Sequence, residues 1–443
     1  MADEPLHRAI SGRMLVVFIV GDILGAGIYA LVGKLAGHVG GVMWLPLAIG
    51  FLVAALTAGS YAELVGKYPR AAGAALYTHR AWKRPFVTFL VAFAVLMSGV
   101  SSAATAARAF GGEYLAAFVS TPPMIASLAF LGVITLVNFL GISESVKVNF
   151  VLTVIEALGL AVVLVVGAIG IASGAGDPGR ALSFDAPDGA VLGVLGATAL
   201  GFYALIGFED SVNLAEETDE PHRTFPRALF AGIAVTGAIY VAIAIVAVIL
   251  VEPAALARSS GPLLDVVVAA GVRFPAELFA GIALLAITNT ALLNMIMASR
   301  LLYGMANEKI VPSVFARVHA KRKTPIVAIG FTVVIALALT AIGSVKELAE
   351  TTVLLLLVVF GLVNIIVLVL RRRPVDHAHF KTSRIAAGAG ALFSFVLASP
   401  LTGRSPRIYL FAAILLGIGA LIWLLNRLIA GQRTSFDAEK LTK

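Results

Sequence analysis

Three carboxylate side chains lie inside long apolar stretches of this 443-residue chain. Asp22 belongs to GDILGAGIYAL, Glu156 to VLTVIEALGL and Glu209 to FYALIGFED. A carboxylate is costly in such surroundings, so it marks a place where an ammonium group, a metal cation or a proton is handled. The three acids form no obvious catalytic pair, which favours binding or proton carriage over an enzymatic reaction.

Glycines interrupt two of these stretches. The first contains Gly21, Gly25 and Gly27, and the second has Gly201 before it and Gly207 inside it. Unpaired backbone at membrane depth is tolerated only where it is buried in protein or lines a cavity. Interruptions at corresponding places in two halves of a chain point to a binding site at the middle of the membrane. The alternative is close helix packing, for which Gly21 and Gly25 have the usual spacing.

Such breaks predict a site with two kinds of backbone group. Free N–H groups are expected at Gly25, Ala26 and Gly27, where the positive end of a half-helix suits a carboxylate. Free carbonyls, which suit an ammonium group, are expected near Ile23 and from Tyr203 to Ile206, Ala204 included. A small zwitterion such as an amino acid satisfies both sets.

Each buried acid has a functional and a structural interpretation. Asp22 can hold an amine or accept a proton, or it can brace neighbouring backbone. Glu156, about midway along its stretch, can carry a proton or attract a cation, or it can be a protonated acid bonded within the helix packing. Glu209 is expected near the start of a half-helix, whose dipole favours an acid there.

Neutral polar side chains add candidates. The oxygens of Thr288, Asn289 and Thr290 can line an ion position opposite Glu156, although such side chains more often bond their own helix backbone. Four hydroxyls at helical spacing form a stripe that is either pocket wall or packing surface: Ser98, Ser101, Ser102 and Thr105.

The elements that position these residues are predicted from composition. The chain is 60% hydrophobic and only 13% charged, against about 25% charged in a usual soluble protein. Apolar runs of membrane-spanning length predict an all-α membrane protein with twelve spans. We place them at 14–37, 41–66, 86–110, 122–141, 146–173, 191–216, 226–251, 273–303, 325–343, 350–370, 385–402 and 406–428.

Charge distribution predicts the orientation. Most of the 33 Lys and Arg residues fall at the end of the bundle that also holds both termini, which places the termini in the cytoplasm of a plasma-membrane protein. The net charge of +8 is thereby assigned to loops rather than to nucleic-acid binding. The chain has no cysteine, and we expect neither a metal site nor a cofactor.

Several motifs resemble the amino acid–polyamine–organocation (APC) superfamily of transporters. Gly25 to Tyr29 resembles its GxGI[FY] signature, and FYALIGFE resembles FxAFxGFE. Further matches are AEETDEPHRTFPRAL, the pair YAEL and YPRAAGAALY, and SRLLYGMA, while SSAATAARAFGGEYL resembles the cationic amino acid transporter branch.

The resemblance implies a LeuT-type fold with two inverted repeats of five helices and two accessory helices. We therefore expect one transporter domain over 1–430, with repeats at 14–173 and 191–370, accessory helices at 385–428 and a cytoplasmic tail at 431–443. Tyr203 and Phe208 would help to close the pocket, and Glu209 would act in gating or proton linkage. Glu156 departs from relatives that carry lysine at what looks like this position.

The leading hypothesis is a proton-coupled symporter of amino acids that works by alternating access in the lipid bilayer. Neutral amino acids are favoured, and a cationic amino acid or a polyamine, moved by transport or exchange, is the alternative. A channel would instead need a continuous polar pore or rings of like charge, and the sequence shows isolated acids.

Overall fold

The computed structural model describes residues 11–69, 73–141, 146–187, 189–215 and 217–430, of which 146–150, 429 and 430 are described by their backbone alone. The predicted tail at 431–443 lies outside these residues. Every regular element of the described residues is a helix.

The α-helices are α1 (Gly12–Ile23), α2 (Ala26–Val39), α3 (Trp44–Lys67), α4 (Gly73–Trp82), α5 (Pro85–Phe110), α6 (Glu113–Ala116), α7 (Pro123–Leu140), α8 (Val146–Ala172), α9 (Ala190–Gly201), α10 (Pro221–Leu250), α11 (Pro253–Arg258), α12 (Pro262–Ala269), α13 (Ala276–Asn307), α14 (Ile326–Ile342), α15 (Val345–Leu370), α16 (Arg384–Ala398) and α17 (Pro406–Ala430). Short 3-10 helices include η4 (Phe202–Leu205) and η5 (Asp210–Leu214).

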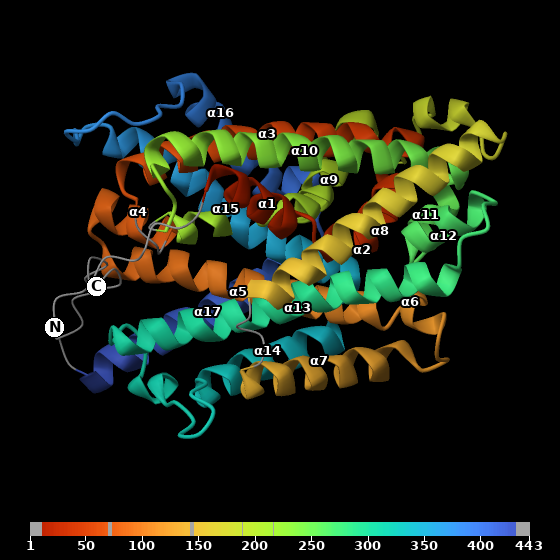
Figure 1. Ribbon diagram of the computed structural model, residues 1–443. Coiled ribbons are helices and arrows are strands. Elements are labelled where there is room, and N and C mark those ends of the chain that lie inside the picture. Colours follow the sequence, from red (N-terminus) through yellow and green to blue (C-terminus); the bar gives the residue numbers. More distant parts are fainter. Residues whose placement is uncertain (1–10, 70–72, 142–145, 188, 216, 431–443) are drawn as a thin grey trace.

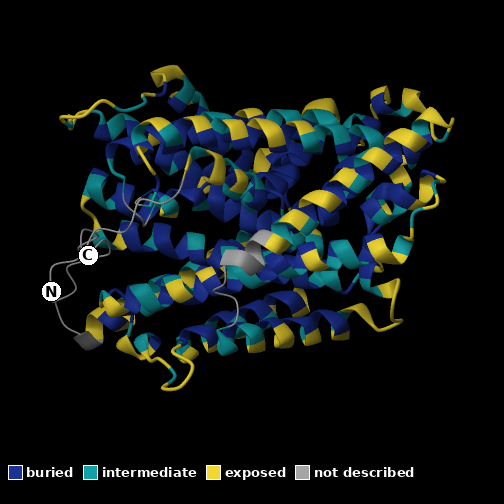
Figure 2. Cartoon of the chain, in the orientation of Figure 1, coloured by how far each residue is buried: buried dark blue, intermediate teal, exposed yellow. Residues whose placement is uncertain are grey.

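The long helices lie side by side in one bundle (Figure 1). Within the described residues, ten segments are long and apolar enough to cross a membrane when α1 and α2 count as one. Two more apolar helices, α14 and α16, are shorter. Buried residues gather inside the bundle and exposed ones on its outer helices (Figure 2), where large apolar side chains such as Leu52, Ile125 and Val334 are exposed. This pattern is that of a multi-span membrane protein.

Helix boundaries differ from the sequence prediction chiefly at four connections. Helix α10 begins at Pro221 rather than near 226, because proline is accepted in a first helical turn. Helix α15 begins at Val345 rather than near 350, because Ser344 and Glu347 form a capping box before it. The segments expected as loops also contain α4, α11 and α12.

Both glycine-rich stretches are interrupted. Helices α1 and α2 meet at an angle of 49° across Leu24 and Gly25. Helix α9 ends at Gly201, and after η4 the chain is extended at Ile206. Gly207 has φ of +130°, a conformation that a residue with a side chain rarely adopts, and η5 follows.

The pattern of helix contacts repeats along the chain. When α1 and α2 are counted as one crossing, a contact between two helices has a counterpart between the two helices that lie five crossings away in the chain. The contact of α3 with α9 has its counterpart in α10 with α1, and that of α5 with α15 in α13 with α8. Likewise α5 with α14 matches α13 with α7, and α3 with α15 matches α10 with α8. Two structurally related halves would produce this repetition of contacts.

A buried amide ties α15 to α3. The Nδ2 group of Asn364 donates to Thr57 Oγ1 at 2.9 Å, and Ser60 Oγ donates to Asn364 Oδ1 at 2.6 Å. Asn364 is fully buried and also donates to the Phe360 carbonyl of its own helix. Hydrogen bonds between helices substitute for the hydrophobic force that is missing inside lipid.

We expect Asn364→Leu to destabilise the protein by roughly 1–2 kcal/mol, because it removes two bonds between helices and leaves both hydroxyls unpaired. Thermal unfolding in detergent measures the loss. Thr135→Val is the matched control, since the Thr135 hydroxyl bonds only the Leu131 carbonyl of its own helix. Equal melting temperatures for the two variants would contradict the role given to Asn364.

Candidate functional site

The backbone groups at the first break have partners within the protein. The Gly25 N–H donates to the Ile23 carbonyl at 2.8 Å, and the Ala26 N–H donates to Thr290 Oγ1 at 2.9 Å. The Ile23 carbonyl also accepts the Tyr240 hydroxyl at 2.8 Å. These groups were expected to be free for a ligand, whereas here the Gly25 N–H is bonded to backbone, and side chains of α13 and α10 bond the Ala26 N–H and the Ile23 carbonyl. Unpaired backbone would be expensive at this depth.

The two breaks touch each other. A Cβ added to Gly27 would lie 2.7 Å from the Cα of Ala204, and one added to Gly207 would lie 2.5 Å from the carbonyl oxygen of Asp22. Glycine is required at both positions because backbone meets backbone there. Gly21 instead packs against a side chain: a Cβ added there would lie 2.3 Å from Cγ2 of Thr153 on α8, so the packing interpretation accounts for that glycine.

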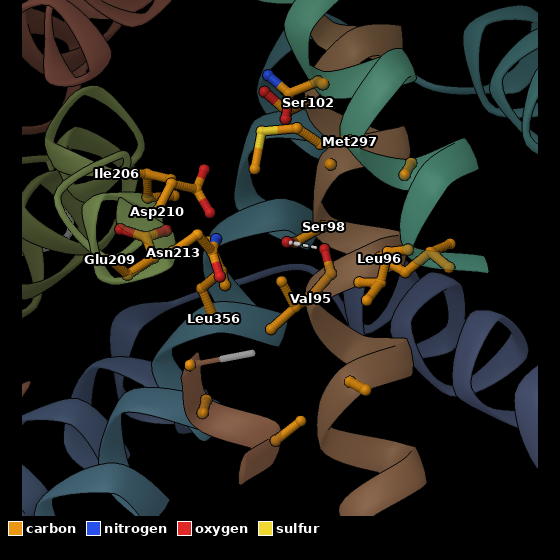
Figure 3. A pocket seen from close by; sticks show the side chains of 18 of the residues that line it. Val95, Leu96, Ser98, Ser102, Ile206, Glu209, Asp210, Asn213, Met297 and Leu356 are labelled. Atoms are coloured by element: carbon orange, nitrogen blue, oxygen red, sulfur yellow. Dashed lines mark hydrogen bonds between the residues drawn. The ribbon is translucent and has the colours of Figure 1, made fainter. Parts of the chain in front are cut away.

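A cavity of about 300 Å³ adjoins the second break (Figure 3). Its volume is at the small end of the range of about 300–1,000 Å³ for ligand pockets. Ile206, Glu209, Asp210 and Asn213 line one side of it, facing Ser98, Ser102 and Met297 of α5 and α13. The hollow therefore lies beside the breaks rather than between them. Of the residues predicted for the site, Ile206 and Glu209 reach its wall.

The cavity extends from the breaks toward the end of the bundle that carries α4. Gly73, Ala74 and Ala75 line it from α4, and Arg300 and Leu301 line it from the last turns of α13. In Figure 1 this end, which we call the α4 end, lies on the left, and α6, α11 and α12 lie on the right.

Two adjacent acids belong to this wall. Glu209 is buried, and its Oε2 accepts the Gly207 N–H at 2.9 Å, so this acid stabilises the break itself. Asp210 points toward the open space in Figure 3. The sequence analysis did not assign Asp210, although its place next to Glu209 in the matched motif was a usable signal. Together the two carboxylates make this side of the cavity attractive to a cation.

Tyr203 and Phe208 face different partners. The Tyr203 hydroxyl forms a 2.9 Å hydrogen bond with Ser102 Oγ, which joins the second break to α5 beside the cavity. Phe208 is fully buried, with ring centroids 6.1 Å from Tyr61 and 5.3 Å from Phe360. In this structure Phe208 is thus part of an aromatic core rather than of the cavity wall.

The hydroxyl stripe divides between the two expected roles. Ser98 and Ser102 line the cavity, whereas Ser101 donates to the Leu348 carbonyl of α15 and Thr105 to the Ser101 carbonyl. One helix face therefore serves as pocket wall and as packing surface.

Glu156 occupies a second buried polar site. It has no exposed surface, and neither of its carboxylate oxygens has a hydrogen-bond partner among the described residues. The carboxyl of Asp22 and the buried amide of Asn289 lie within range of electrostatic interaction with it. Tyr29 donates to the Glu156 carbonyl at 2.9 Å. The site thus brings together two acids from α1 and α8 that the sequence singled out separately.

Helix α13 contributes unequally to this second site. Thr288 bonds the Leu284 carbonyl at 2.6 Å, as hydroxyls in membrane helices often do. Asn289 faces Glu156, and the neighbouring Thr290 accepts the Ala26 N–H at the first break. The sequence offered Thr290 as an ion-lining oxygen rather than as a partner of the first break, and Tyr240 is a contact that only the fold could identify. No group of three or more His, Cys, Asp or Glu able to hold a metal occurs in the part of the chain that the structure describes.

Comparison with known proteins gives these sites a context. A family model described as amino acid permease matches residues 10–424. The branched-chain amino acid permease BcaP of Bacillus subtilis is 25% identical over 395 residues, which cover 84% of this chain and 83% of that protein. The vacuolar cationic amino acid transporter 4 of Arabidopsis thaliana is 27% identical over 403 residues, covering 85% of this chain and 66% of that protein.

An uncharacterized transporter of Mycobacterium tuberculosis is 31% identical over 343 residues, covering 76% of this chain and 75% of that protein. The family model spans both broken segments, the cavity and the Glu156 site, and it confirms the resemblance found in the sequence motifs. The chain therefore belongs to the amino acid permease family of membrane transporters.

Proposed function

We propose that the chain is a secondary active transporter that moves amino acids across the plasma membrane by alternating access. The carrying observation is the cavity beside the second break, whose lining residues run toward the α4 end, together with the contact between Gly27 and Ala204 where the two breaks meet. A carrier needs such a one-sided cavity, whereas a channel needs a continuous pore.

The proposed architecture has two related halves, 14–173 and 191–370, followed by accessory helices at 385–428. The exchange of helix contacts supports the two halves and counts α14 as a crossing, and the proposal counts α16 as a further crossing outside them. Basic residues gather at the α4 end, which we therefore place in the cytoplasm together with both termini. The cavity then faces inward.

Substrate binding is proposed to require separation of the two breaks. The amides of Gly25, Ala26 and Gly27 would then receive the substrate carboxylate. The carbonyls of Ile23, Tyr203 and Ile206, with Asp22 nearby, would receive its ammonium group. Movement of Ala204 away from Gly27 would admit the substrate, and Phe208 would shift with it.

Neutral amino acids remain the favoured substrates, because much of the cavity wall is apolar: Ala92, Val95, Leu96, Met297, Ala298, Leu301 and Leu356. The carboxylates of Glu209 and Asp210 give specific support to a second candidate, a cationic amino acid or polyamine. Both classes have relatives in the comparisons, one named for branched-chain and one for cationic amino acids.

Proton coupling is proposed to run through Glu156. Its carboxyl is fully buried beside another acid, and one proton shared by the pair would remove their repulsion. Thr288 and Asn289 lie on the helix that faces this pair, and Glu209 would link proton binding to the second break. A change in the position of α1 would alter the separation of Asp22 from Glu156 and so couple the proton to the gate.

We expect the purified protein in proteoliposomes to accumulate labelled leucine and to show faster uptake when unlabelled substrate is present inside. Gly27→Ala should lower this uptake about tenfold or more, since overpacking against the Ala204 backbone costs roughly 1–3 kcal/mol. Gly330→Ala is the control, because nothing lies within 4 Å of a Cβ added there. Normal transport by Gly27→Ala would refute the gate, and uptake without stimulation would favour a channel.

Asp210→Asn separates the two substrate classes. If cationic amino acids enter the cavity, arginine competes with leucine uptake, and the variant should weaken that competition roughly 10- to 100-fold, as expected for loss of a charged hydrogen bond. Leucine uptake itself should change little. Asp219→Asn, at an exposed position away from the cavity, is the control. Absence of competition by arginine in the unaltered protein would leave neutral amino acids as the substrates.

Glu156→Gln should abolish accumulation driven by a pH gradient while exchange of leucine across the membrane continues. The amide keeps the size of the side chain but cannot take up and release the proton. The two assays are run on the same proteoliposomes, with Glu277→Gln at an exposed site as the control. Equal loss of exchange and of gradient-driven accumulation would argue for a structural role instead.

A further inference from the structure

A second cavity of about 610 Å³ lies at the α4 end, away from the candidate substrate cavity. It is formed by the last turns of α3, the end of α15 and the segment that leads into α16. Four basic residues line it: Lys67, Arg371, Lys381 and Arg384. His377 and His379 also line it, and Glu63 is the one acid among its described lining residues.

The carboxylate of Glu63 already has hydrogen-bond partners within the protein. Glu63 Oε1 accepts Arg371 Nε at 2.8 Å, and Glu63 Oε2 accepts both Arg371 Nη2 and the Thr382 N–H. One carboxylate therefore balances one guanidinium, and the charges of Lys67, Lys381 and Arg384 have no acid in the cavity wall. Asp376 lies in the same segment but does not line the cavity.

The cavity is built rather than incidental. Lys67 is 5% exposed, and its ammonium group donates to the Leu370 carbonyl at 2.5 Å, which ties the ends of α3 and α15 together. The His377 ring nitrogen is 2.9 Å from the Gly66 carbonyl, and Arg371 also bonds the Thr382 carbonyl. Two helix ends and the connecting segment thus hold the cations in place around one space.

His379 lies within the electrostatic range of Lys381, Lys67 and Glu63. Its pKa is lowered, first by burial and further by Lys381 and Lys67, although Glu63 and the His377 carbonyl act in the opposite direction. Lys67 is buried, whereas Lys381 and Arg384 are exposed, so the group of cations reaches from the protein interior to its surface. Cations gathered around one space repel one another, and an anion that joins them removes this repulsion.

An apolar surface begins immediately beside the cavity. Ile385, the residue after Arg384, is 84% exposed, and Leu392 on the same helix is 61% exposed. These side chains belong to the lipid-facing surface of α16. A ligand with an anionic head and hydrocarbon chains would satisfy the cavity and this surface together.

We propose that this cavity binds the phosphate group of an anionic phospholipid, with Lys67, Lys381 and Arg384 around the phosphate and the acyl chains along α16. Basic pockets between helices at the cytoplasmic surface are suited to such headgroups, and each Lys or Arg near the surface adds about 1 kcal/mol. Free phosphate shares the recognised group but lacks the chains, so the two sources can be distinguished.

The test uses the purified full-length protein in nanodiscs of phosphatidylcholine with increasing phosphatidylglycerol, read by thermal unfolding and by native mass spectrometry of retained lipid. The double variant Lys381→Gln, Arg384→Gln should require roughly 10- to 30-fold more phosphatidylglycerol for the same stabilisation. The matched control is Lys321→Gln, Arg322→Gln, which removes two exposed charges from another segment at the same end.

The unaltered protein and the control should retain phosphatidylglycerol, and millimolar inorganic phosphate should neither replace it nor stabilise the protein. Equal lipid dependence of both double variants would overturn the proposal, because it would assign the effect to diffuse surface charge. Stabilisation by inorganic phosphate that depends on Lys381 and Arg384 would overturn the lipid assignment. Neither outcome depends on transport activity.

Discussion

The membrane interior provides no water to pair with an interrupted backbone, and the centre of this protein is arranged around that constraint. Two chain segments lose their α-helical hydrogen bonds at the same depth, and each is completed by the rest of the bundle. Thr290 and Tyr240 bond the first break, Glu209 bonds the second, and the breaks meet at Gly27 and Gly207. In the proposed transport cycle the contact opens, and the polar groups of the substrate take over as partners of the backbone groups at the breaks.

Depth and partners give the buried acids different roles. Glu209 is engaged by the backbone of the second break, while Asp210 is directed into the cavity. Glu156 has no hydrogen bond to its carboxylate among the described residues and has another acid nearby. Glu209 is suited to stabilising the break, Asp210 to contacting a ligand and Glu156 to exchanging a proton. Their proximity to α1 and η5 connects all three to the same movable elements.

Charge is also separated along the bundle. The substrate cavity has acids on its wall, and the second cavity at the α4 end has a cluster of cations. Acids near the breaks favour ammonium groups, and cations at the membrane surface favour phosphate. A transporter of zwitterions that is held by anionic lipid would use both the acids and the cations. Helix α15 passes close to each cavity, because Leu356 lines the first and Arg371, at the end of the helix, lines the second.

Hydropathy and glycine spacing alone determined the membrane class, the limits of most helices and the positions of both breaks, because these features depend on residues that are neighbours in the chain. The motifs between Gly25 and Ala306, taken together, predicted the family for the same reason. The tertiary structure decided that Gly27 is covered by Ala204, that Phe208 joins an aromatic core and that Asp210 rather than Phe208 reaches the cavity. It also paired Glu63 with Arg371, more than 300 positions away, and placed Asp22 beside Glu156. Contacts of this kind depend on the direction of each side chain within the packed bundle, which local sequence patterns do not specify.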